Sequence, residues 1–86
     1  MSSNTSNDST YKRELIEHLL AAKDYDMLDQ ALSDLLTPTE MTEISKRLQI
    51  LRLLEAGLPQ REIAEMLGVG IATVTRGSRA LKSHST

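Results

Sequence analysis

The chain has 86 residues, a net charge of −2 and no Cys, Phe or Trp. The lack of Cys excludes disulfides, thiolate zinc sites and cysteine nucleophiles, and no apolar run approaches the roughly 20 residues that span a bilayer. The sequence therefore predicts one small cytoplasmic domain, without a membrane partner. Its core of Leu, Ile, Val, Met and Ala is thin, so we expect a second copy to complete it.

Apolar residues follow helical spacing along the chain, and we expect an all-α fold of about five helices. Residues 1–8 are polar and are expected to form a disordered tail. A first helix is predicted over about residues 9–22, with Asp8 or Ser9 as its cap. Its apolar face is broad for a helix at the end of a small protein, which favours coverage by a partner chain.

A second helix is predicted over about residues 25–36, and the segment Thr37-Pro38-Thr39-Glu40 ends it and starts a third. A threonine cap, a proline at the first helical position and a glutamate three residues after the cap are typical of a helix start. Gly57 is expected to end this third helix. Its predicted apolar face consists of Met41, Ile44, Leu48, Leu51 and Leu54. We expect residues 9–57 to form a helical dimerisation region.

Residues 60–82, QREIAEMLGVGIATVTRGSRALK, are typical of a helix-turn-helix, which places its second helix in the major groove of DNA. Its two helices are predicted over about residues 61–67 and 71–82. They lie within an expected DNA-binding region of residues 58–82, and residues 83–86 are expected to form a loose tail. Gly68 is expected to supply the positive φ of the turn. Four apolar residues are spaced to share a small core: Ile63, Leu67, Val69 and Val74.

The second half of the chain carries the charge that DNA attracts. Residues 45–86 have seven Lys or Arg and three Glu, which gives a net charge of +4. Residues 1–44 have three Lys or Arg and nine Asp or Glu, which gives a net charge of −6. A polyanion such as DNA would be attracted to residues 45–86. Ordinary clustering of surface charge would give the same division of charge between the two halves. Small residues at the start of the second short helix let backbone N–H groups approach phosphates or bases. The residues expected to contact DNA are Gln60, Arg61, Gly70, Ile71, Ala72, Thr73, Thr75, Arg79 and Lys82.

The chain resembles the Trp repressor family over roughly residues 28–82. The resemblance is carried by the run GIATVTRGSRALK, by QREIAEMLG before it, and by the helix that starts at Leu-Thr-Pro and contains Arg47. The resemblance implies a transcriptional repressor, built as an intertwined homodimer, whose reading heads move into register on an operator when L-tryptophan binds as co-repressor. It also implies that Arg47 and Arg76 hold the indole between them. Thr37 would help to hold the carboxylate, and the backbone carbonyls of Leu35 and Leu36 would receive the ammonium group.

The resemblance further implies that Thr73 and Gly77 line the ligand pocket. The residues themselves agree, because a glycine inside a helix costs about 1 kcal/mol relative to Ala and is expected to leave a hole beside Arg76. An arginine there can stack on a planar ligand and pair with its carboxylate. The alternative is that Gly77 only permits close packing and Arg76 only touches phosphate.

Three features depart from the family pattern. Ala80 stands where the family carries a serine that helps to hold the ammonium group, so we expect the ligand to be L-tryptophan or a related small planar carboxylate. The loop before the first short helix is one residue shorter, with Pro59 in place of a capping Ser or Thr. The chain ends soon after Lys82, whereas the family continues into a further helix.

Other classes of protein fit the sequence less well. An enzyme would need chemistry that two histidines, His18 and His84, and the exposed pair Asp24 and Asp26 do not supply, and no metal-ligand spacing occurs. A ligand-independent helix-turn-helix, of the kind that transposases and resolvases carry, would explain residues 57–69 but neither Arg47 nor the segment TRGS. A pure dimerisation protein would leave the polar second helix unexplained.

Overall fold

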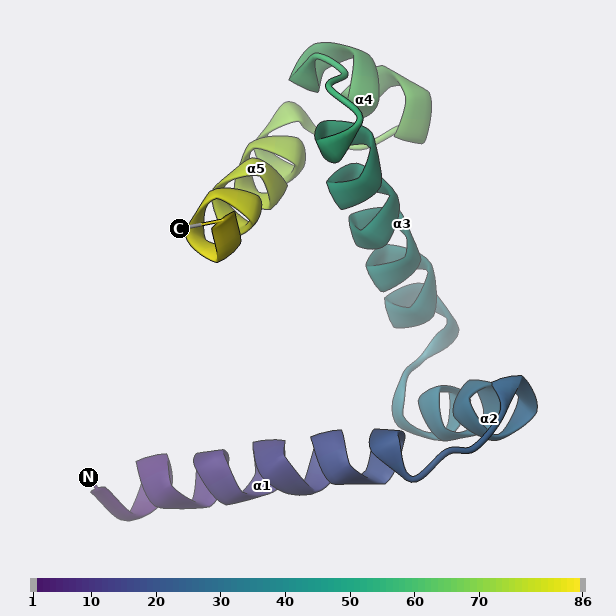
Figure 1. Ribbon diagram of the computed structural model, residues 1–86, viewed down its shortest axis with the longest axis vertical. Coiled ribbons are helices and arrows are strands. Elements are labelled where there is room, and N and C mark those ends of the chain that lie inside the picture. Colours follow the sequence, from purple (N-terminus) through teal and green to yellow (C-terminus); the bar gives the residue numbers. More distant parts are fainter. Residues whose placement is uncertain (1, 86) are drawn as a thin grey trace. The chain divides into compact units, whose positions relative to one another are not determined.

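The computed structural model describes residues 2–85, with side chains over residues 7–83. The described residues form five helices and no strand, which confirms the predicted all-α class. The helices are α1 (Ser2–Leu20), α2 (Tyr25–Leu35), α3 (Pro38–Glu55), α4 (Gln60–Leu67) and α5 (Ile71–Ser85) (Figure 1). The chain divides into two compact units, residues 1–41 and 42–86. No helix in the described range is long and apolar enough to cross a bilayer.

In the first unit, α1 packs against α2. Asp24 caps α2, since its Oδ1 accepts a hydrogen bond of 2.9 Å from the Met27 N–H. The start of α1 differs from the prediction, because residues 2–8 are helical and neither Asp8 nor Ser9 begins the helix. Extending a formed helix costs less than nucleating one, so a polar segment can continue the helix that residues 9–20 form.

The first unit has no buried core of its own. Over residues 7–41 no side chain is buried. Large apolar side chains face outward on both helices, and the most exposed are Tyr25 at 84%, Leu20 at 77% and Tyr11 at 63%. The broad apolar face predicted for the first helix is thus present, and nothing within this unit covers it.

Helix α3 begins and ends as its sequence predicts. Thr37 Oγ1 accepts from the Glu40 N–H at 3.1 Å while Glu40 Oε1 accepts from the Thr37 N–H at 2.9 Å, which is a reciprocal capping box. At the other end Gly57 has a φ of +91°. Its N–H bonds to the Leu54 carbonyl, and the next N–H, of Leu58, bonds to the Leu53 carbonyl, which is the Schellman pattern.

Three residues from three helices form the core of the second unit: Ile50 of α3, Ile63 of α4 and Val74 of α5, each at most 1% exposed. The partly buried residues packed around them are Leu53, Leu54, Leu58, Ala64, Leu67 and Val69. The predicted core of α4 and α5 is therefore confirmed. The predicted face of α3 is wrong in part, because Ile50 is the buried residue while Ile44 and Leu48 stay 37% and 47% exposed.

Candidate functional site

Helices α4 and α5 pack against each other across a tight turn. Gly68 ends α4 with a φ of +65° and a ψ of +40°, and its N–H bonds to the Ala64 carbonyl. This confirms the positive φ predicted for the turn. At the start of α4, Pro59 makes no side-chain capping bond, as expected for a proline in place of a hydroxyl residue. Gly70 precedes α5, and its carbonyl accepts from the N–H groups of Thr73 and Val74.

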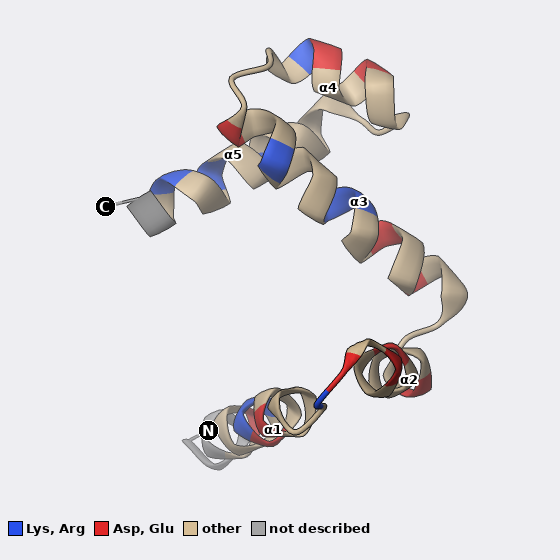
Figure 2. Ribbon diagram, turned by 45° about the vertical axis from the view of Figure 1, so that its right-hand side comes forward, with Lys and Arg blue, Asp and Glu red and all other residues tan. Residues whose placement is uncertain are grey.

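Helices α1, α3 and α4 carry both basic and acidic residues, whereas α2 carries acidic residues without Lys or Arg, and α5 carries Lys and Arg without Asp or Glu (Figure 2). Among the nine residues expected to contact DNA, six are exposed: Arg61, Gly70, Ile71, Ala72, Arg79 and Lys82. Ile71 is half-exposed, at 50%, although it is a large apolar residue. The leading turn of α5 therefore presents a small apolar surface to solvent.

The other three, Gln60, Thr73 and Thr75, are partly buried, so their side chains are less accessible to DNA than the other six. The Thr75 hydroxyl lies 2.8 Å from Gln60 Oε1 and 3.0 Å from the Ile71 carbonyl oxygen. This hydroxyl makes an intramolecular hydrogen bond, which links the first residue of α4 to the second turn of α5.

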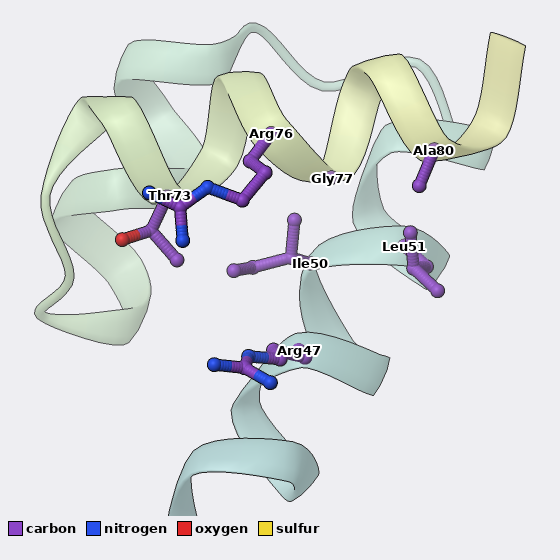
Figure 3. A pocket seen from close by; sticks show the side chains of 7 residues that line it. All are labelled: Arg47, Ile50, Leu51, Thr73, Arg76, Gly77 and Ala80. Carbon is purple, nitrogen blue, oxygen red and sulfur yellow. The ribbon is translucent and has the colours of Figure 1, made fainter. Parts of the chain in front are cut away.

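A cavity of about 320 Å³ lies between α3 and α5 (Figure 3). It is lined by Arg47, Ile50, Leu51, Thr73, Arg76, Gly77 and Ala80. The cavity wall contains two guanidinium groups, one from each helix, and is otherwise mostly apolar. Such a surface suits a flat apolar molecule that carries an anionic group, since arginine both stacks on aromatic rings and pairs with carboxylates.

Gly77 sets how closely α5 approaches α3. A Cβ atom at this position would lie 2.8 Å from Cγ2 of the buried Ile50, well inside van der Waals contact. The hole expected at position 77 is thus filled by Ile50, and the cavity lies beside the glycine instead. Gly77 both permits close packing and lines the cavity.

A second cavity of about 190 Å³ shares Arg47, Ile50, Thr73 and Arg76 with the first and adds Glu43, Lys46 and Val69. Arg47 Nη2 lies 3.9 Å from Glu43 Oε2, and both side chains are more than half exposed. Three cationic side chains and one carboxylate therefore surround this second space, which makes it favourable for an anion.

Comparison with known proteins gives the family. The family model described as Trp repressor protein matches residues 12–86. Proteins named Trp operon repressor homolog are similar to this chain: that of Vibrio vulnificus (strain YJ016) is 48% identical over 73 residues, which are 84% of this chain and 69% of the relative. That of Vibrio campbellii is 42% identical over 83 residues, 93% and 83% of the two chains. The chain belongs to the Trp repressor family.

The structure brings together five of the residues that the resemblance to the Trp repressor family implies for a ligand: Arg47, Thr73, Arg76, Gly77 and Ala80 line one cavity. Leu35, Leu36 and Thr37 belong to the first unit and are not among the residues that line it. Sequence reasoning missed Ile50 and Leu51, although the spacing of Ile50, Leu53 and Leu54 was the available signal for a second apolar stripe on α3.

The other site interpretations from the sequence concern histidine and carboxylate residues. His18 is exposed, and the side chain of His84 lies outside the described residues. Asp24 caps a helix. Within residues 7–83 no group of His, Cys, Asp and Glu is arranged to hold a metal ion.

Proposed function

We propose that this chain is a sequence-specific DNA-binding repressor, rather than an enzyme, and that L-tryptophan or a related small planar carboxylate changes its affinity for DNA. One observation carries the proposal: α5 supplies both the exposed leading turn and one wall of the cavity. A ligand in that cavity contacts the helix that would enter the major groove. Membership of the Trp repressor family supports the same function.

The DNA side of the proposal rests on the α4 and α5 pair. An α-helix fits the major groove, and in a helix-turn-helix the first residues of the second helix contact base edges. Here Ile71 and Ala72 begin the second helix and Gly70 precedes it, and all three residues are exposed. The exposed Arg61 at the start of α4 would contact a base edge or a phosphate, while Arg79 would bind phosphate from the middle of α5.

The ligand side rests on Arg47 and Arg76, which line the cavity from α3 and α5 (Figure 3). Arg76 has no ion-pair partner among the described residues, and Arg47 has only the long contact to Glu43. A planar carboxylate would give both guanidinium groups a stacking surface and a counter-charge.

The proposed active form is a homodimer. The first unit exposes its apolar side chains and forms an open groove lined by Tyr11, Glu14, Leu15, His18 and Leu35. A second copy that covers this surface would supply the core that the unit lacks, since a helical pair without buried residues is marginal in water. Two heads related by twofold symmetry then require an operator with two half-sites about 34–36 Å apart, the spacing known for helix-turn-helix dimers, among which the Trp repressor is counted.

The test is selection of binding sites from random duplex DNA by the full chain, followed by fluorescence anisotropy with and without L-tryptophan. We expect a palindromic site, a dimer on it, and an affinity that L-tryptophan changes. A site bound equally well at every ligand concentration, with no heat of ligand binding, would leave a ligand-independent helix-turn-helix protein. The same affinity for every duplex would exclude a sequence-specific repressor.

A further inference from the structure

The second cavity lies beside the leading turn of α5. Val69 and Thr73, which line it, are the residues on either side of the exposed positions 70–72. Those positions form the segment that would enter the major groove in the proposed function. Helix α3 supplies four further lining residues: Glu43, Lys46, Arg47 and Ile50. The second cavity therefore connects α3 to the edge of the surface that would face DNA.

Positive charge dominates the lining of the second cavity. Lys46, Arg47 and Arg76 carry three positive charges and Glu43 one negative charge, which leaves a net charge of +2. The guanidinium groups of both arginines point to the side on which Thr73 lies (Figure 3). Helix α5 carries no Asp or Glu. A phosphate group beside the leading turn of α5 would therefore meet mostly positive charge.

Lys46 differs from the two arginines in its surroundings. Both arginines also line the first cavity, and Arg47 lies 3.9 Å from a carboxylate oxygen of Glu43. Lys46 lines the second cavity and not the first. Over residues 7–83 it has no ion-pair partner, although its side chain is partly buried. A lysine can bury its aliphatic stem while its ammonium group stays accessible, so Lys46 is free to bind an anion from outside the chain.

We propose that Lys46 binds a phosphate of the DNA backbone, so that α3 contacts DNA from outside the helix-turn-helix. The inference rests on the proposed DNA-binding function. With the start of α5 at the base edges, the phosphates that border the major groove pass beside its leading turn. Contacts to phosphate fix the position of a protein on the duplex and carry no sequence information directly. Lys46 on α3 would thus act together with Arg79 and Lys82 on α5 to hold α5 in one orientation in the groove.

The experiment is fluorescence anisotropy of the full chain on its selected duplex and on an unrelated duplex, at several salt concentrations. Lys46→Gln should weaken binding to both duplexes by the same factor. Because one fewer phosphate is neutralised per head, the fall in a dimer's affinity between about 50 and 200 mM salt should be about tenfold smaller than in the wild type. Lys23→Gln removes an exposed lysine from the first unit. It is the matched control and should leave the salt dependence unchanged.

Two further measurements locate the contact. Glu43→Gln should strengthen binding to both duplexes, because it removes the one carboxylate among the residues that line the second cavity. Neutral methylphosphonate linkages, placed one at a time in the selected duplex, should reveal one phosphate per half-site at which Lys46→Gln causes no further loss of affinity. That result would show that the side chain and the phosphate act as a pair.

The outcomes separate this inference from the proposed function. A Lys46→Gln variant that binds its selected duplex with wild-type affinity and salt dependence would overturn the role of Lys46 and leave the repressor function intact. A loss confined to measurements with L-tryptophan present would assign Lys46 to the ligand, and a loss of inorganic phosphate binding alone would assign it to a free anion; either result would overturn the inference. A wild-type chain that binds no duplex would remove the DNA half of the proposed function, and this inference with it.

Discussion

Gly77→Ala tests whether the contact between α5 and α3 is as tight as the structure has it. The added Cβ would lie 2.8 Å from Ile50 Cγ2, and ordinary contact begins at 3.4 Å, so the two atoms must separate by about 0.6 Å. Ile50 is 1% exposed, and a β-branched side chain turns little about χ1. Overpacking of this kind costs about 1–3 kcal/mol, whereas alanine gains about 1 kcal/mol in helix propensity. We expect a net loss of about 0–2 kcal/mol.

The background variant Ile50→Leu separates the two contributions. It keeps the side-chain volume but removes Cγ2, so Gly77→Ala should stabilise the protein there by about 1 kcal/mol. The free energy of unfolding is measured by urea denaturation followed by circular dichroism, at one fixed protein concentration because the stability of the proposed dimer would depend on it. A gain of about 1 kcal/mol in the wild-type background as well would show that Ile50 yields freely and that close packing is not the reason for the glycine.

Further predictions concern DNA contacts and helix capping. Arg61→Ala should cost about 1–3 kcal/mol in operator binding and relax base preference at one position of each half-site; an equal loss on every duplex would restrict Arg61 to phosphate. Lys82→Ala should lower DNA affinity evenly and flatten its salt dependence by about one unit per head, and an unchanged slope would remove Lys82 from the interface. Thr75→Val should weaken DNA binding in the wild-type chain but hardly at all in a Gln60→Ala background, because the Thr75 hydroxyl is hydrogen-bonded to the Gln60 side chain. Additive losses in the double variant would mean that the Thr75 hydroxyl contacts DNA itself. Thr37→Ala should destabilise the fold by about 0.5–2 kcal/mol in denaturation experiments, and no change would show that the capping box contributes nothing.

The elements that local chemistry specifies were predictable from the sequence. The Thr37 capping box, the glycines at positions 57 and 68 and the core of α4 and α5 all depend on residues close together in the chain. The structure has them where the sequence predicts them. The meeting of Arg47 with Arg76 was predictable only through resemblance to a family, because 29 positions separate them and no periodicity relates two helices.

The missed features depend on which side of a helix meets which neighbour. Helix α3 has apolar residues on more than one side, so spacing alone could not decide whether Ile50 or Leu48 would be buried. The same uncertainty hid the contact of Ile50 with Gly77. The internal hydrogen bond of Thr75 was missed because its partner Gln60 lies 15 residues earlier, on another helix.

In the proposed function the ligand and the DNA would contact different faces of α5, and the sequence of the helix separates these faces. Thr73, Gly77 and Ala80 follow one stripe along the helix, at spacings of four and three residues, and all line the cavity. Ile71 and Ala72 stand exposed at its start. A ligand against the stripe can change DNA affinity only as far as it binds the DNA-competent orientation of α5 more tightly than others, with each tenfold preference worth about 1.4 kcal/mol. The opposite wall of the cavity belongs to α3. The affinity for the ligand would therefore depend on the position of α5 relative to α3, and a preference for one orientation of α5 requires such a dependence.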